Sequence, residues 1–147
     1  MKRSRILAFA LGTAAVALAT VAPAEAAPQG AYQYKSWRQG TCIAADTPNR
    51  LYQGSCDWRA KWVQDTADLS FRNTYLNACL DTNGSDLYLS TCNSTDPGQK
   101  WYVDQFTTGW QIRSKLNLHR VTAWNSGELS LSQPLSTDKA WFERLPG

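Results

Sequence analysis

The chain has 147 residues, with 15 basic and 12 acidic side chains and a formal net charge of +3. This length predicts a single domain, and so mild a charge predicts no nucleic-acid partner, because nucleic-acid binders carry a clustered basic patch. Aromatic residues make up 12% of the chain, including seven Trp, which is not typical of a disordered protein. The single histidine, His119, argues against His-rich metal sites, and we expect neither a metal nor a cofactor.

The first 26 residues have the features of a secretory signal peptide. A positively charged segment at residues 2–5 precedes an apolar run over residues 6–21, and Ala24-Glu25-Ala26 is a cleavage site of the A-x-A type. A membrane anchor is the less favoured alternative, because a spanning helix needs about 20 apolar residues. Removing these residues takes away three basic side chains and one acidic one, so the net charge falls to +1. We expect a secreted, extracellular domain over residues 27–147, with no membrane contact after cleavage.

A threefold repeat follows the predicted signal peptide. One block of sequence recurs without gaps at residues 34–42, 71–79 and 112–120, and a second block recurs at 51–56, 87–92 and 129–134. Each unit then ends on a tryptophan, at Trp62, Trp101 and Trp141. A period near 40 residues indicates a repeat architecture. We expect the three tryptophans in one core, and units at about residues 31–68, 69–108 and 109–147.

The blocks are predicted to be short strands. Leu87 and Leu89 alternate with Tyr88 at period two, and turn-forming clusters such as residues 83–86 separate the runs. No window shows a sustained helical period. About four strands fit in each unit, hence about twelve in all. Three units are too few for a propeller, so the pattern predicts an all-β fold of three four-strand repeats around a pseudo-threefold axis.

The four cysteines favour disulfides over a zinc site. Export places them in an oxidising compartment, and no two of them have the C-x-x-C spacing of a zinc knuckle. Three connectivities are possible. The repeat favours Cys42–Cys56 and Cys79–Cys92, each within one unit. The third unit has no such pair.

Three motifs in the middle unit form a recognisable pattern: Cys-Leu-Asp at 79–81, Leu-Tyr-Leu-Ser-Thr-Cys-Asn at 87–93 and Gln-Lys-Trp at 99–101. This pattern resembles the ricin B-type (R-type) lectin repeat with its Q-x-W motif, and the spacing extends over residues 31–147. The resemblance implies a β-trefoil and a small, secreted, stand-alone member of bacterial type. It also implies recognition of galactose-like or other sugars in shallow sites. The outer units lack the Gln of the motif.

The resemblance places a sugar site in the middle unit. Asp81 matches the Asp that accepts hydrogen bonds from sugar hydroxyls, a role that suits an ionised carboxylate. The family's stacking aromatic is replaced by Ser90, but Tyr88 lies two residues earlier on the same strand face. Asn93 remains as a polar contact. The candidate carbohydrate-binding residues are therefore Asp81, Tyr88 and Asn93.

Each of these residues has a structural alternative. Asp81 could instead be a turn-forming residue whose carboxylate accepts from the amides of Asn83 or Gly84. Tyr88 could cover the barrel surface with its hydroxyl in water. We expect Gln99 to brace the core. Trp58 and Trp124 lie beside turn-rich stretches, so either ring could be exposed to a ligand.

These features leave three functions open. The first is a carbohydrate-binding module for a galactose-like sugar or a polysaccharide. The second is a protein-binding trefoil, such as a protease inhibitor or an adhesion partner, since a fold alone does not select a function. The third is a glycosidase using a pair from Asp81, Asp86 and Asp96. The third is disfavoured because a trefoil of this size offers no deep cleft, and we expect no enzyme.

Overall fold

The computed structural model describes residues 30–47, 50–133 and 138–147, and the predicted signal peptide lies outside them. The described residues form twelve strands and three 3-10 helices (η1–η3), and none of their helices is long and apolar enough to cross a bilayer. The elements in chain order are β1 (Tyr32–Ser36), β2 (Cys42–Thr47), β3 (Arg50–Gly54), η1 (Trp58–Ala60), β4 (Trp62–Gln64), β5 (Phe71–Asn73), β6 (Ala78–Thr82), β7 (Leu87–Ser90), η2 (Pro97–Gln99), β8 (Trp101–Phe106), β9 (Gly109–Ser114), β10 (Arg120–Ala123), β11 (Leu129–Ser132), η3 (Asp138–Ala140) and β12 (Phe142–Pro146).

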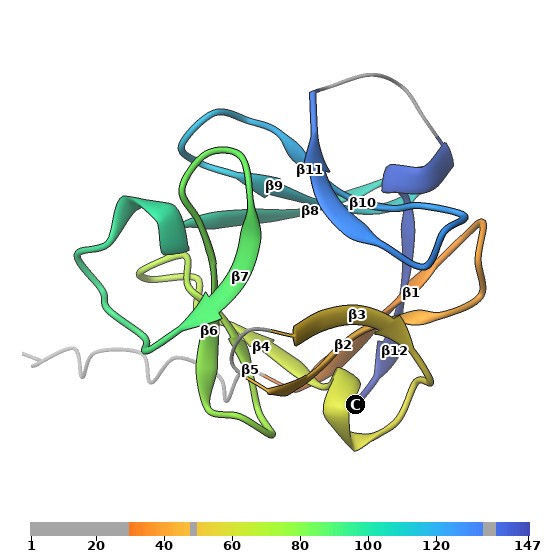
Figure 1. Ribbon diagram of the computed structural model, residues 1–147, viewed down its shortest axis with the longest axis horizontal. Coiled ribbons are helices and arrows are strands. Elements are labelled where there is room, and N and C mark those ends of the chain that lie inside the picture. The colour runs from red at the N-terminus through yellow and green to blue at the C-terminus, as the bar shows by residue number, and fades with distance from the viewer. Residues whose placement is uncertain (1–29, 48–49, 134–137) are drawn as a thin grey trace, which may run out of the picture.

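Three units of four strands and one 3-10 helix surround a common axis (Figure 1). The second and third strands of each unit form an antiparallel hairpin: β2–β3, β6–β7 and β10–β11. The outer strands pair between units, β4 with β5, β8 with β9 and β12 with β1, so the sheet closes on itself. This arrangement is the β-trefoil, and the predicted fold class is confirmed.

The core is filled by the inward-facing residues of each strand. Trp62, Trp101 and Phe142 are completely buried, and each lies two residues after the last residue of its 3-10 helix. The indole nitrogens of Trp62 and Trp101 each donate to a strand carbonyl at 2.8 Å. The prediction that Trp141 is the third core ring is wrong. Phe142 takes that position, and Trp141 is only partly buried, with its ring against Phe106.

Both predicted disulfides are present. Cys42 and Cys56 join with their Cα atoms 5.0 Å apart, and Cys79 and Cys92 join at 4.9 Å. Each bond joins the open end of one hairpin, away from its turn, to the segment that leads into the 3-10 helix. No free cysteine occurs in the described part of the chain.

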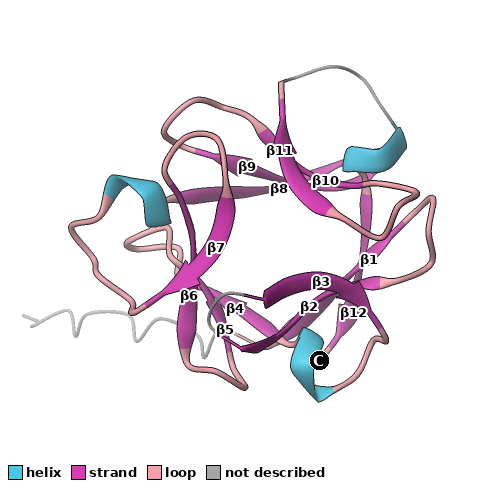
Figure 2. Ribbon diagram, in the orientation of Figure 1, coloured by secondary structure: helices cyan, strands magenta, loops and turns pink. Residues whose placement is uncertain are grey.

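The 3-10 helices position the candidate site, because each covers the outer face of its own hairpin. Figure 2 shows the three helices at three separate corners of the molecule. Helix η1 packs on β2, η2 on β6 and η3 on β10. Two of these helices begin at an aspartate that accepts from a backbone amide two residues on, Asp57 in unit 1 and Asp96 in unit 2.

Candidate functional site

The outer face of the β6–β7 hairpin carries the predicted site. Strand alternation places Leu80 and Leu89 in the core, so the opposite face presents Asp81, Tyr88 and Ser90. Asp81 and Tyr88 are direct cross-strand partners. Two of the three predicted residues are thus neighbours, as the sequence interpretation requires.

Asp81 lies beneath the surface, with 4% of its area exposed. Its Oδ1 accepts from the Thr82 amide at 2.7 Å, and its Oδ2 accepts from the Ser90 hydroxyl and from Gln99 Nε2, the latter at 3.2 Å. The alternative in which the Asp81 carboxylate accepts from the amides of Asn83 or Gly84 is wrong. The Gly84 amide donates to the Thr82 hydroxyl, and the amides of the following two residues donate to Asn83.

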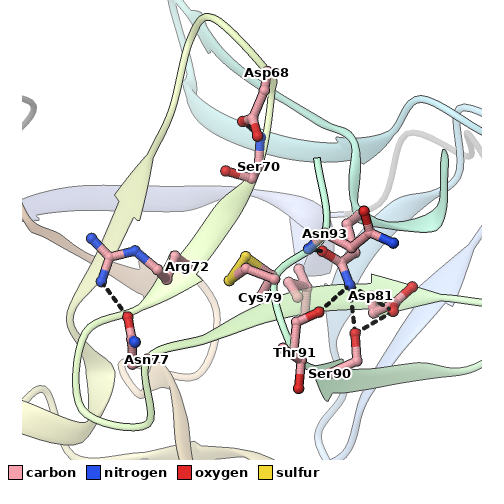
Figure 3. The surroundings of a disulfide bond; sticks show 12 residues. Asp68, Ser70, Arg72, Asn77, Cys79, Asp81, Ser90, Thr91 and Asn93 are labelled. Atoms are coloured by element: carbon pink, nitrogen blue, oxygen red, sulfur yellow. Dashed lines mark hydrogen bonds between the residues drawn. A yellow bond between two sulfur atoms is a disulfide. The ribbon is translucent and has the colours of Figure 1, made fainter. Parts of the chain in front are cut away.

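Gln99 connects two of the three predicted residues, Asp81 and Asn93. Its side-chain nitrogen donates to Asp81, to the Ser90 hydroxyl at 2.6 Å and to the Thr91 carbonyl at 3.0 Å, while its oxygen accepts from the Asn93 amide at 2.8 Å. Figure 3 shows four of its partners, Asp81, Ser90, Thr91 and Asn93, beside Cys79 and its disulfide. Gln99 is almost completely buried, so the expectation that it acts as a brace is confirmed.

Asn93 lies at the rim of this group. Its side-chain oxygen accepts from the amide and the hydroxyl of Thr95, at 3.0 and 2.8 Å. The residue is exposed. The Asn93 side chain therefore shapes the turn that leads into η2, and its backbone amide ties that turn to Gln99.

Gly98 allows η2 to close over Asp81. A Cβ at this position would lie 2.5 Å from Asp81 Oδ1 and 2.3 Å from the Thr82 carbonyl oxygen. Only glycine fits so close an approach without a shift of the backbone.

Negative charge surrounds Tyr88. Burial raises the pKa of the Tyr88 hydroxyl above its ordinary value, and the charges of Asp81, Asp96 and Asp86 raise it further. The Asp86 carboxylate accepts from Asn83 at 3.0 Å, and the Asp96 carboxylate accepts from the Gly98 amide at 2.8 Å. Acidic side chains therefore gather around one aromatic ring, and we name the group of Asp81, Tyr88 and Asn93 the polar notch.

The matching positions in the outer units have different chemistry. Ala44 stands where unit 2 has Asp81, and Tyr52 is its cross-strand partner. In unit 3 the corresponding residue is Thr122, whose hydroxyl bonds with that of Ser132. Ala60 and Ala140 replace Gln99. Among the three described hairpins, a carboxylate with an aromatic cross-strand partner at this position occurs in unit 2 alone.

A separate surface hollow of about 320 Å³ lies on the β4–β5 hairpin, lined by Val63, Asp65, Ser70 and Arg72. Figure 3 shows Ser70 and Arg72 on one side of the disulfide and Asp81 on the other, so this hollow and the polar notch are distinct. Within the described residues, no group of three or more His, Cys, Asp or Glu side chains could hold a metal ion.

No protein-family model matches the sequence, and no curated protein matches it. Solved structures do match. The designed threefold-symmetric protein ThreeFoil gives a TM-score of 0.65 at 15% identity, over 79% of this chain and 98% of that one. The β-trefoil lectin of the Vibrio vulnificus hemolysin/cytolysin, with N-acetyl-D-lactosamine bound, gives 0.67 at 14% identity, over 82% and 96%.

The C-half of the earthworm R-type lectin, in complex with GalNAc, gives a TM-score of 0.66 at 11% identity, over 80% of this chain and 99% of that one. Such low identities establish the fold alone. The chain is a β-trefoil protein, and sugar-binding lectins are among the structures that it resembles.

Proposed function

We propose that this protein is a secreted carbohydrate-binding module of the ricin B type, and that its sugar site is the polar notch of unit 2. The observation that carries the proposal is the pairing of Asp81 with Tyr88 across the β6–β7 hairpin. A carboxylate beside a partly exposed ring offers an acceptor for hydroxyls and an apolar face for a pyranose. Asn93 contributes a further polar contact at the rim.

The Asp81 carboxylate suits this role because it is fixed in place. An ionised carboxylate has about four acceptor positions. Three are used by Thr82, Ser90 and Gln99. Only 4% of Asp81 is exposed, and the Tyr88 hydroxyl also bonds to its carboxylate, so a sugar hydroxyl would have to reach the carboxylate beside Tyr88. The three internal donors keep the carboxylate oxygens in a fixed position for that contact.

The ligand is a neutral, galactose-like sugar or a polysaccharide of such units. The charges of the Asp81, Asp86 and Asp96 carboxylates all act on Tyr88, so we expect them to repel sulfated or sialylated sugars. One stacked ring contributes about 0.5–1.5 kcal/mol on the aromatic-pair scale. Each site is therefore weak, and useful affinity arises on polymers that engage several copies.

A glycan array with the protein secreted from the full chain tests this function. We expect neutral galactose-terminated glycans to bind, and Tyr88→Ala to lower their signal at least threefold. Tyr52→Ala is the matched control, because Tyr52 has the same register position in unit 1 but faces Ala44. An equal loss in both variants would contradict the assignment of the site, and an array without any binding would refute the function.

Secretion is tested in the same preparation. We propose that residues 1–26 are removed after Ala26. The intact mass of the protein in the culture medium should correspond to residues 27–147 with four cysteines oxidised. A cell-associated protein of full mass would contradict this proposal.

A protein-binding role is the second candidate, supported by exposed rings outside the notch such as Trp37, at 61% exposure. We propose no enzymatic activity. The Asp86 and Asp96 carboxylates hold the turns on either side of the notch, through Asn83 and Gly98. Release of reducing sugar from any array glycan by the purified protein would refute this.

A further inference from the structure

Two exposed rings from different units meet on the surface. Trp58 in η1 and Tyr75 in the turn between β5 and β6 have exposed fractions of 53% and 49%. Their centroids are 4.2 Å apart, and the ring planes make an angle of 76°. The two rings form an open corner. We call this feature the aromatic corner.

The backbone on both sides of the corner is held by buried groups. Asn73, which is completely buried, donates to the Arg59 carbonyl at 2.9 Å and accepts from the Tyr75 and Leu76 amides at 3.1 and 3.0 Å. The Asp57 carboxylate caps η1 by accepting from the Arg59 amide at 2.9 Å. A ligand therefore meets rings that are already ordered, which lowers the entropic cost of binding.

The fold itself does not require aromatic residues here. In each unit, the residue directly after the first strand donates its backbone amide to a carbonyl of the neighbouring unit. In unit 2 this bond runs from the Thr74 amide to the Lys61 carbonyl. The corresponding pair between units 3 and 1 is an ion pair, Arg38 with Asp138 at 3.0 Å. The aromatic corner is thus a local feature of the junction between units 1 and 2.

Charges beside the corner cancel. The Arg59 guanidinium lies 5.3 Å from the Trp58 ring centroid and pairs with Asp57 at 2.6 Å. Both charged side chains remain about one third exposed, at 34% and 28%. The corner thus combines an apolar face with hydrogen-bond donors and acceptors and has no excess charge. A neutral, hydroxyl-rich molecule with an apolar face has the complementary chemistry.

We propose that the aromatic corner is a second carbohydrate subsite, which takes a neutral pyranose unit of a glycan. The sugar lies with its C–H face on Trp58 and its edge against Tyr75, and its hydroxyls bond with Asp57 and Arg59. The angle between the rings favours a flexible soluble chain over a flat crystalline polysaccharide. This proposal rests on the proposed function, because it supplies the second contact that a polymer-binding module needs.

The location adds avidity without competing with the notch of unit 2. Helix η1, which carries Trp58, and helix η2, which covers Asp81, lie at different corners of the molecule (Figure 2). A polymer held at both places dissociates more slowly than one held at either. The expected gain applies to polymeric ligands and not to short sugars.

NMR titration of the secreted protein tests the proposal, with N-acetyllactosamine, cellohexaose and a β-1,4-galactan oligomer as probes. We expect at least one probe to shift the indole N–H signal of Trp58, assigned with Trp58→Phe, in a saturable way. The Trp37 signal should stay in place, although that ring is at least as exposed. The shift should persist in 0.5 M NaCl, because the adjoining charges cancel.

The outcomes separate this proposal from the function on which it rests. Shifts confined to the β6–β7 hairpin would overturn the subsite and leave the notch standing. Shifts at Trp58 alone would support the subsite and overturn the notch, and no shift with any probe would overturn both.

A polymer assay provides the second measurement. Binding to polyacrylamide bearing N-acetyllactosamine should fall at least tenfold in Trp58→Ala/Tyr75→Ala and remain unchanged in Trp37→Ala. Because all three side chains are exposed, these variants should fold, and circular dichroism and thermal unfolding check this. Unchanged polymer binding by the double variant would overturn the subsite and leave this corner to a protein partner.

Discussion

Gln99 and Asp81 should be strongly coupled in stability. Gln99→Ala removes four hydrogen bonds and leaves the buried Asp81 carboxylate with one donor fewer. A hydrogen bond to a charged group contributes about 1.5–3 kcal/mol, and the cavity adds to this loss. We expect Gln99→Ala to lower the free energy of unfolding by about 3–5 kcal/mol.

Unit 3 supplies the compensating change. There the same three positions are Thr122, Ser132 and Ala140, and the two hydroxyls bond to each other. The double variant Asp81→Thr/Gln99→Ala copies that solution into unit 2, where Ser90 is already present. The double variant removes the buried charge together with the side chain that donates to it. Its loss of unfolding free energy should therefore be smaller than the sum of the losses in the two single variants, by about 1.5–3 kcal/mol.

Urea unfolding followed by tryptophan fluorescence measures all four species of this cycle. The disulfides stay oxidised throughout, so that the denatured state has the same cross-links in each variant. If the double loss equals the sum of the single losses within about 0.5 kcal/mol, the sites are independent. That result would refute the account of Gln99 as a brace for the Asp81 charge.

Three further predictions concern the rest of the fold. Replacing both cysteines of either disulfide with Ala should lower the free energy of unfolding by about 3 kcal/mol, measured by urea unfolding, and unchanged stability of such a variant would contradict this. Burial raises the pKa of Tyr34 to about 12, so between pH 10 and pH 12 the unfolded chain releases a proton that the folded protein retains. Stability should fall by roughly 2–3 kcal/mol over this range, and Tyr34→Phe should abolish this part of the pH dependence. Trp101→Phe should cost about 1–3 kcal/mol by leaving the Leu80 carbonyl without its indole donor, while circular dichroism should show an intact fold because Phe142 already fills the same position in unit 3.

The fold was predictable because its signals are local and repeated. Alternating residues such as Leu87, Tyr88 and Leu89 define a strand within five positions, and the same blocks recur three times. The cysteine pairing followed from that repetition. Each of these inferences needed only the order of residues within one unit.

The errors arose where packing decides between neighbouring residues. Trp141 has the residue type of a core ring, but the backbone of unit 3 places Phe142 inward, one position later. A repeat aligned on tryptophan cannot show this shift. The burial of Asp81 was equally invisible, because it depends on the approach of Gly98 from seventeen residues away. The contact between Trp58 and Tyr75 joins two units and has no counterpart in the sequence pattern.

The three hairpins show how few residues separate a filled position from the proposed binding position. In unit 1, a Cβ at Gly54 would lie 2.6 Å from a ring atom of Tyr52, so the missing side chain lets that ring lie over the hairpin beside Ala44. In unit 2, Ser90 stands at the position of Gly54 and bonds to Asp81. The Ser90 hydroxyl therefore takes the space that the Tyr52 ring fills in unit 1. The tyrosines are the same in type and register, and they differ in what lies beside them. On the proposed function, the difference between the two units therefore lies in the small residues beside each ring, which is why Tyr52→Ala is a fair control for Tyr88→Ala.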